Sequence, residues 1–255
     1  MFTHENIVGL IPAAGSAARL PDLRFSKELI KVVDRSGSNE KPDAIIDRLM
    51  DDMRSAGASK AIIVTRRAKR DLQEYLSEEP RSRLPSSFVF VKNTPSVPYT
   101  LSFASSFLKS STVLFGFPDI LYQPRTSFPK LLTHQADAGS DLVLGLFRTT
   151  RADKSDMVEY DAEYRLRRIT IKTKSPLPYA WALAVWRPRF TEYLGNYVAN
   201  WYEKPRSNSE LQLSTIITEA QIDGLKVTVE VIHDGEFLDV GTPDDLARMQ
   251  DFFAT

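Results

Sequence analysis

Short hydrophobic segments alternate with helix-like segments in the first half of the chain, and this alternation constrains the fold more than any other feature. Segments with the character of buried strands cover residues 7–12, 61–65, 88–91 and 112–117. Helices are predicted between them, over residues 42–57, 67–76 and 98–108. Strands that alternate with helices imply a largely parallel sheet with crossover helices. We therefore predict an α/β fold.

The second half of the chain is richer in strands. Strand patterns cover residues 141–147, 157–160, 166–172, 179–186 and 227–232, and helices are predicted near 188–201 and 210–222. In a closing helix, Thr242 is the predicted cap, Pro243 the first helical residue and Asp244 the acid of the first turn. No long linker divides the chain, so we predict one domain over residues 1–255.

Charge and cysteine content exclude several classes of function. Lys and Arg together number 33, as do Asp and Glu. No net field therefore draws the protein to nucleic acid or to a membrane, and any anion site must be built locally. The chain has no cysteine, which excludes disulfides, thiolate catalysis and zinc–thiolate sites. The lack of cysteine favours a reducing cytoplasm, so we expect a cytoplasmic protein. No segment is long enough to cross a membrane, so we expect the protein to be soluble. A homo-oligomer stays open.

Small residues follow the first strand, and two basic residues come after them. The small residues are Ala13, Ala14, Gly15 and Ser16, and the basic residues are Arg19 and Lys27. Small side chains let a bulky anion approach backbone N–H groups, and the cations neutralise its charge. Open α/β sheets bind ligands at the carboxyl ends of their strands. The segment is typical of a site for a nucleoside triphosphate, although neither a Walker loop nor a dinucleotide fingerprint occurs.

Four motifs in order make a more specific pattern. They are GSAAR with FSKELIKV, then KPDAIIDRLMDDMRSAGASKAIIVT, then FGFPDIL, and finally FLDVGTPDDL. In these motifs the chain resembles the sugar-1-phosphate nucleotidyltransferases, such as the glucose-1-phosphate thymidylyl- and uridylyltransferases. The resemblance covers almost the whole chain. It implies a Rossmann-like mixed, mostly parallel sheet flanked by helices, and Mg²⁺-dependent transfer of a nucleoside monophosphate from a triphosphate to a sugar 1-phosphate.

The resemblance also implies roles for individual residues. Catalytic roles fall to Arg19, Lys27 and Asp119, and the Mg²⁺ ligands are Asp119 and Asp239. Nucleotide binding falls to Ala13, Ala14, Gly15, Ser16 and Pro95. Binding of the sugar phosphate is assigned to Glu159 and Lys174, with Lys172 as the alternative lysine. Because Mg²⁺ completes its coordination with phosphate oxygens and water, two aspartates are sufficient protein ligands.

Several positions depart from the pattern of the family. Ala17 and Ala18 replace a glycine and a threonine of the first motif, and Lys92 stands where relatives read the base with glutamine. Asp156 stands where many relatives have glycine beside the sugar. The base and the sugar are therefore not identified. Two alternatives stay open: cytidylyl transfer to another phosphorylated acceptor, and a catalytically silent homologue that binds a nucleotide-sugar.

Overall fold

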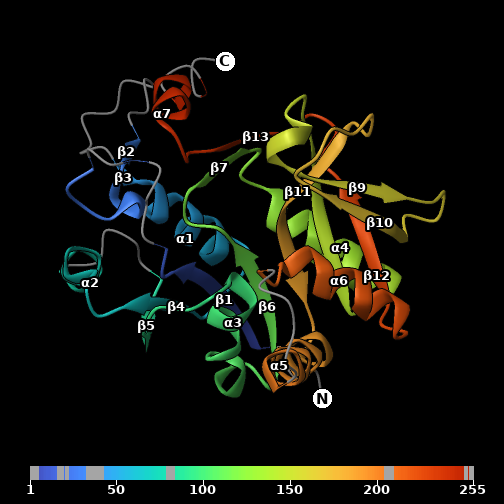
Figure 1. Cartoon of the computed structure of the whole chain (residues 1–255), viewed down its shortest axis with the longest axis horizontal. Helices are drawn as coiled ribbons and strands as arrows, with labels where there is room; N and C mark the ends of the chain where they lie inside the picture. Colours follow the sequence, from blue (N-terminus) through green and yellow to red (C-terminus); the bar gives the residue numbers. More distant parts are fainter. Residues whose placement is uncertain are drawn as a thin grey trace.

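The computed structural model describes residues 6–15, 20, 23–32, 43–78, 84–203, 210–249 and 252. In these residues, nine strands form one sheet, in the order β10-β9-β11-β6-β1-β4-β5, with β8 paired to both β11 and β12 (Figure 1). The strands are β1 (Asn6–Ala13), β4 (Lys60–Arg66), β5 (Ser86–Val91), β6 (Ser111–Gly116), β8 (Leu142–Arg148), β9 (Asp156–Tyr160), β10 (Leu166–Ile171), β11 (Tyr179–Trp186) and β12 (Val227–Val231). Only β10 and β11 run against the others. The predicted α/β fold with a mixed, mostly parallel sheet is confirmed.

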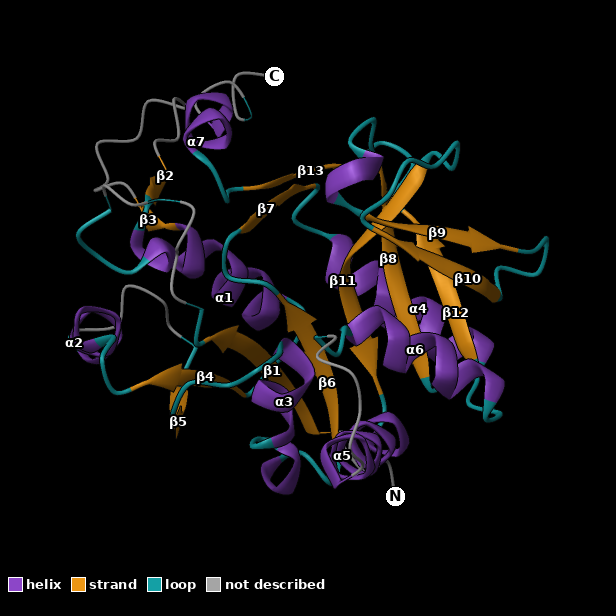
Figure 2. Ribbon diagram, in the orientation of Figure 1, coloured by secondary structure: helices purple, strands orange, loops and turns teal. Residues whose placement is uncertain are grey.

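Helices cover both faces of this sheet (Figure 2). One face carries α1 (Ile45–Ser55), α2 (Arg70–Ser77) and α4 (Ser127–Ala138), and the other carries α3 (Val97–Ser102), α5 (Pro188–Glu203) and α6 (Leu213–Ile222). Each helix buries an apolar stripe against the strands. A glycine lets α1 approach closely, because a Cβ at Gly116 would lie 2.6 Å from Cδ1 of Leu49.

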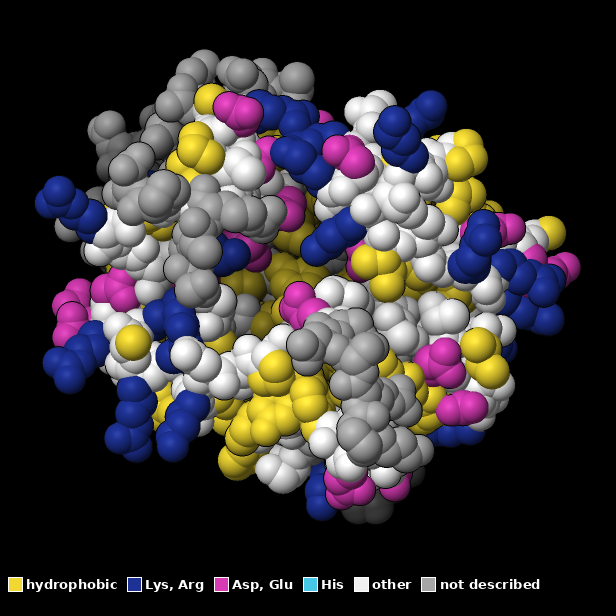
Figure 3. All heavy atoms as spheres, in the orientation of Figure 1, with side chains coloured by type: hydrophobic (Ala, Val, Ile, Leu, Met, Phe, Trp, Pro, Cys, Tyr) yellow, Lys and Arg dark blue, Asp and Glu magenta, His cyan; other side chains and the backbone are white. Residues whose placement is uncertain are grey.

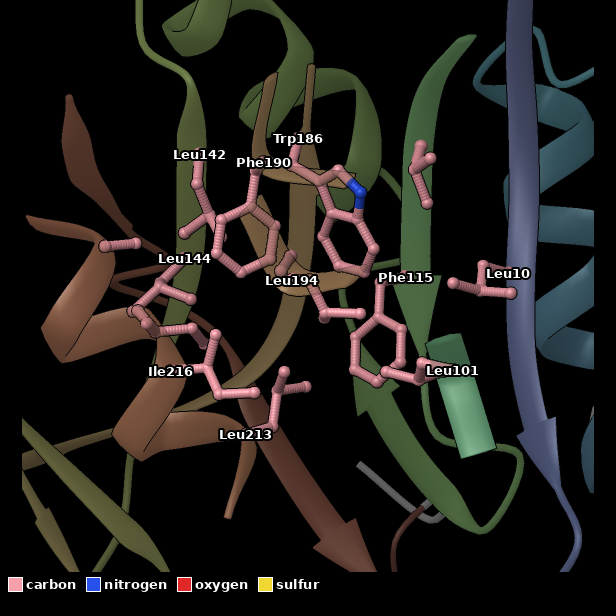
Figure 4. Close-up of a cluster of buried hydrophobic side chains, with 14 of the residues drawn as sticks. Leu10, Leu101, Phe115, Leu142, Leu144, Trp186, Phe190, Leu194, Leu213 and Ile216 are labelled. Carbon is pink, nitrogen blue, oxygen red and sulfur yellow. The ribbon is translucent and has the colours of Figure 1, made fainter. Parts of the chain in front are cut away.

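The core on the α5–α6 face is built around large aromatic side chains (Figure 4). The ring of Trp186 lies 5.3 Å from Phe115 and 5.3 Å from Phe190, centroid to centroid. The indole N–H of Trp186 donates to the Thr191 hydroxyl over 3.0 Å, so this buried polar group is satisfied. The core therefore packs α5 against β6 and β11.

A smaller layer of structure lies beyond the ends of the main strands. The strand β7 (Ile120–Gln123) pairs antiparallel with β13 (Glu236–Asp239), and β2 (Lys31–Val32) pairs with β3 (Asp43–Ala44). The short 3₁₀ turn η1 (Lys27–Leu29) and the closing helix α7 (Pro243–Met249) belong to the same layer. Its own apolar cluster includes Ile30, Leu121, Leu238 and Met249. This layer brings together segments from both halves of the chain.

Most predicted elements are present. The elements that were not predicted are the helix α4 and the short strands β2, β3, β7 and β13. The helix predicted over 98–108 is two pieces, α3 and a 3₁₀ turn at Ser105–Phe107, and the helix predicted over 67–76 begins only at Arg70. Thr242 caps α7 as predicted, since its hydroxyl accepts from the backbone N–H of Asp245 over 3.4 Å. None of the described helices combines the length and apolar character that a membrane span needs.

Candidate active site

A cleft of about 930 Å³ opens at the carboxyl ends of the parallel strands. Figure 3 shows it as a hollow with an apolar floor and charged side chains at its rim. The strand ends that contribute lining residues are those of β1 (Ala14, Gly15), β4 (Arg66), β5 (Asn93 to Val97), β6 (Phe117, Asp119) and β8 (Thr149, Arg151). This is the edge at which open α/β sheets bind their ligands.

The two predicted metal ligands, Asp119 and Asp239, line the same cleft. Asp119 lies in the turn between β6 and β7, and Asp239 ends β13 opposite Ile120 of β7. The backbone N–H of Val240 donates to the carbonyl oxygen of Asp119 over 2.9 Å, which joins the two segments directly beside the acids. Two acids from distant parts of the chain are thus held in one wall.

This donor set fits Mg²⁺. Among the described residues, no group of three or more His, Cys, Asp or Glu side chains could hold a metal by itself. Mg²⁺ is commonly bound through one or two carboxylates together with substrate phosphates and water. Two neighbouring carboxylates in an open cleft meet that requirement.

Lys27 forms an ion pair with Asp119 through Nζ and Oδ2. Burial of the ammonium group opposes its charge, but the Asp119 carboxylate outweighs this effect, and Glu28 and Asp239 act in the same direction. The pKa of Lys27 therefore lies above its ordinary value. Lys27 is held as a cation beside both acids.

The residues on either side of Lys27 are tied to α2. Lys69, just before α2, donates to Oε1 of Glu28 over 2.6 Å, and the Glu28 side chain is fully buried. The hydroxyl of Ser26 donates to the Asp71 carboxylate over 2.8 Å, and its backbone N–H donates to the same group over 2.5 Å. The turn that carries Lys27 is therefore anchored at two points that do not involve Asp119 or Asp239.

Part of the predicted nucleotide loop lies at the cleft. Ala14, Gly15 and Pro95 line it, whereas Ala13 is buried in β1 and does not. A Cβ at Gly15 would meet no atom within 4 Å, so space is open at this point. Ser16 and Arg19 lie outside the described residues.

Arg66 was missed by sequence reasoning. Its guanidinium donates to the carbonyl of Gly15 over 3.2 Å and to the Asn93 side chain over 3.1 Å, and it lines the cleft. It links the ends of β1, β4 and β5. Its position directly after the strand at 61–65, in an α/β pattern, is the signal that could have found it.

The opposite wall carries a second group of basic residues, Arg151, Lys154 and Lys172. Arg151 donates to Oδ1 of Asp245 over 2.7 Å and so connects the end of β8 with α7. Burial opposes the charge of Asp245, but hydrogen bonds from Thr242 and Arg151 outweigh it and hold the pKa of Asp245 below its ordinary value. Arg151 and Lys154 were also missed, although both follow a predicted strand.

The structure does not bring Glu159 and Lys174 to the cleft. Glu159 pairs with Arg168 of β10 over 3.1 Å, and its side chain is 45% exposed. It lies three residues along β9 from Asp156, which is about 10 Å along the strand at the usual rise per residue, and it does not line the cleft. Lys174 does not line the cleft either, whereas Lys172 and Asp156 do. The alternative lysine is thus the one that the fold places at the site.

A mixed α/β sheet with paired acids and two basic groups in a cleft at its strand ends defines an α/β protein whose ligand site lies at the carboxyl edge of the sheet. The chain belongs to the nucleotidyl transferase family, whose model matches residues 8–255. The family resemblance predicted from the four motifs is confirmed.

Solved structures share the fold over nearly the whole chain. A protein described as a glucose-1-phosphate thymidylyltransferase from Bacillus anthracis superposes with a TM-score of 0.80 at 16% identity, covering 97% of this chain and 95% of that one. A UTP-bound UGPase from Acinetobacter baumannii gives 0.79 at 14% identity, covering 97% and 93%. A UDP-glucose pyrophosphorylase complexed with UDP-glucose gives 0.79 at 16%, covering 98% of each chain. A comparison with curated proteins found no match.

Proposed function

We propose that the protein transfers a nucleoside monophosphate from a nucleoside triphosphate to a sugar 1-phosphate and releases pyrophosphate. A phosphate oxygen of the sugar attacks the α-phosphorus, and the bond from that phosphorus to the bridging oxygen of the departing pyrophosphate breaks. The observation that carries the proposal is the meeting of Lys27, Asp119 and Asp239 in one cleft at the strand ends. Family membership and the two neighbours that hold UTP and UDP-glucose support it.

Phosphoryl transfer needs positioning and charge neutralisation more than covalent help from the protein. Lys27 binds the α-phosphate in this proposal, and Arg19 the departing pyrophosphate. Asp119 and Asp239 hold Mg²⁺, which neutralises phosphate charge when bound. Ala14, Gly15 and Pro95 surround the nucleotide.

At the acceptor end of the cleft, the lysine that we assign to the sugar phosphate differs from the one that the sequence favoured. Lys174 was the preferred ligand of the sugar phosphate, but Lys172 is the lysine that lines the cleft. Lys172 also has a backbone φ of 41°, in the left-handed region that non-glycine residues rarely adopt. Such conformations persist where the surrounding structure imposes them, often at ligand sites. We therefore assign the sugar phosphate to Lys172. We also propose that the reaction takes place in the cytoplasm.

The test is pyrophosphate release measured with ATP, CTP, GTP, UTP and dTTP against a panel of hexose 1-phosphates. Release that depends on both substrates and on Mg²⁺ supports the proposal. Consumption of CTP only with acceptors other than sugar 1-phosphates would favour the cytidylyl alternative. Tight nucleotide-sugar binding without any release would favour the silent homologue.

A further inference from the structure

A carboxylate at the acceptor end of the cleft has no role in the proposed chemistry. Asp156 begins β9, lines the cleft and lies opposite Ile171, the last residue of β10 before Lys172. The backbone N–H of Lys172 donates to the carbonyl of Ser155 over 3.2 Å, so the acid and the lysine are held at the same level of the hairpin. One anion and one cation thus stand side by side where the acceptor must bind.

One oxygen of Asp156 is held in place by a chain of hydrogen bonds. The hydroxyl of Ser214 donates to Oδ2 over 2.5 Å, and the indole N–H of Trp181 donates to Ser214 Oγ over 2.9 Å. Ser214 is fully buried and Trp181 nearly so. Because Ser214 donates its single proton to Asp156 and accepts from Trp181 on one lone pair, residues of β11 and α6 determine the orientation of the carboxylate.

The other oxygen of Asp156 is buried, and no described group donates to it. A buried acceptor without a partner costs roughly 1–3 kcal/mol, more when it is charged. Burial raises the pKa of Asp156, and the Ser214 hydrogen bond and the charge of Lys172 counteract only part of this rise. The protein thus maintains an under-satisfied hydrogen-bond acceptor in the wall of a ligand cleft.

We propose that Asp156 determines acceptor specificity by accepting a hydrogen bond from a hydroxyl group of the sugar whose phosphate lies on Lys172, an inference that rests on the proposed function. The apolar floor beside it suits the carbon face of a sugar ring, because Trp181 and Phe117 line the cleft with their ring centroids 6.0 Å apart. The acceptor class is a hexose 1-phosphate with a free hydroxyl group within reach of this carboxylate. An acceptor without such a donor leaves the acid unsatisfied.

The matched substitution is Asp156→Asn, since the amide keeps an oxygen for Ser214 and replaces the free acceptor by a donor. Pyrophosphate release is measured with the best of glucose, galactose and mannose 1-phosphate and with its monodeoxy analogues. In the wild type, one deoxy analogue should lose about 10- to 100-fold in kcat/KM, the usual effect of a hydrogen bond to a charged group. Asp156→Asn should lose a similar factor on the parent sugar and discriminate much less against that analogue, with the KM for the triphosphate unchanged.

The control is Asp137→Asn on α4, which removes an exposed carboxylate away from the cleft and should keep the wild-type discrimination. Equal discrimination by the wild type and Asp156→Asn overturns the proposal. If Asp156→Asn does not fold, Ser214→Ala serves instead, because it frees the carboxylate without removing it. Its acceptor KM should rise several-fold at constant KM for the triphosphate, and an unchanged acceptor KM also overturns the proposal.

A binding measurement distinguishes a failure of this inference from a failure of the proposed function. If no substrate pair releases pyrophosphate, titration calorimetry with the same hexose 1-phosphates tests Asp156 directly. Tighter binding to the wild type than to Asp156→Asn supports the subsite without the reaction. Equal binding, or none to either protein, overturns it.

Discussion

Lys27 and Asp119 form an ion pair at the cleft although one belongs to η1 and the other to the turn after β6. The cation also lies within electrostatic reach of Asp239 at the end of β13, because the charge of Asp239 helps to raise the pKa of Lys27. Opposite charges at such short range orient each other, so the position of each depends on the other. The two residues should therefore act as a unit in catalysis.

Removing either member of this pair should abolish most of the activity. We expect Lys27→Met and Asp119→Ala each to lose about 3–4 kcal/mol of transition-state stabilisation, as for one preorganised electrostatic partner. The loss should fall on kcat, measured by pyrophosphate release at saturating substrates. The double variant should lose far less than the sum of the two, since coupled residues are not additive.

Lys130→Met is the matched control, because Lys130 is exposed on α4 and does not line the cleft. Its kcat should equal that of the wild type. Wild-type turnover by Asp119→Ala would contradict the assignment of this acid to the site.

The metal requirement should depend on Asp239. EDTA should stop pyrophosphate release, and added Mg²⁺ should restore it. Since even an outer partner of a metal ligand typically contributes about 10–100-fold in affinity, Asp239→Asn should raise the Mg²⁺ concentration at half-maximal rate at least tenfold. Mn²⁺ binding followed by electron paramagnetic resonance in the presence of nucleotide should weaken in parallel. Unchanged Mn²⁺ affinity in this variant would remove Asp239 from the metal site.

The sequence predicts the strands of the main sheet well, because these strands have strong local signals. A run such as AIIVT has the composition of a buried strand independently of its neighbours. Asp119 and Asp239 lie in motifs that occur in a recognisable order along the chain. The strand β7 was missed because four residues with a polar end carry little periodicity. The helix α4 was missed because its apolar and polar residues are mixed and a proline lies near its start.

The acceptor side of the site could not be placed from the sequence. Whether Lys172 or Lys174 enters the cleft depends on where β10 ends and on the left-handed backbone at Lys172, and no pattern in the sequence marks that conformation. The link from Arg151 to Asp245 joins residues far apart in the chain, so only the tertiary fold shows it. Long-range register decides such contacts, and local propensity does not report it.

The buried pair of Glu28 and Lys69 should position Lys27 and contribute to stability. Lys69→Met leaves a fully buried carboxylate without its cation, and breaking such a pair costs about 3–5 kcal/mol. We expect a lower free energy of unfolding in urea and a fall in kcat larger than the rise in KM. Glu28→Leu combined with Lys69→Met should recover much of the stability, because no charge is then left unpaired.

The comparison of Lys69→Met with the double variant distinguishes an effect on stability from an effect on activity. If the ion pair positions Lys27, the double variant should unfold nearly like the wild type and still turn over slowly. Recovery of kcat together with stability would show that the pair only holds the fold. Lys130→Met is again the control for loss of a lysine.

The link between Arg151 and Asp245 should make stability depend on pH in acid. The pKa of Asp245 is depressed in the folded protein, so its carboxylate contributes stability above the unfolded pKa of about 3.9 and loses it as the pH falls through the lower, folded value. Urea unfolding at pH 7 should therefore show Asp245→Asn less stable than the wild type by about 1–3 kcal/mol. The difference should stay constant down to about pH 5 and shrink below pH 4. Asp137→Asn, an exposed acid on α4, should show no such difference at any pH. A gap for Asp245→Asn at pH 3 as large as that at pH 7 would mean that the charge of Asp245 does not stabilise the closing helix.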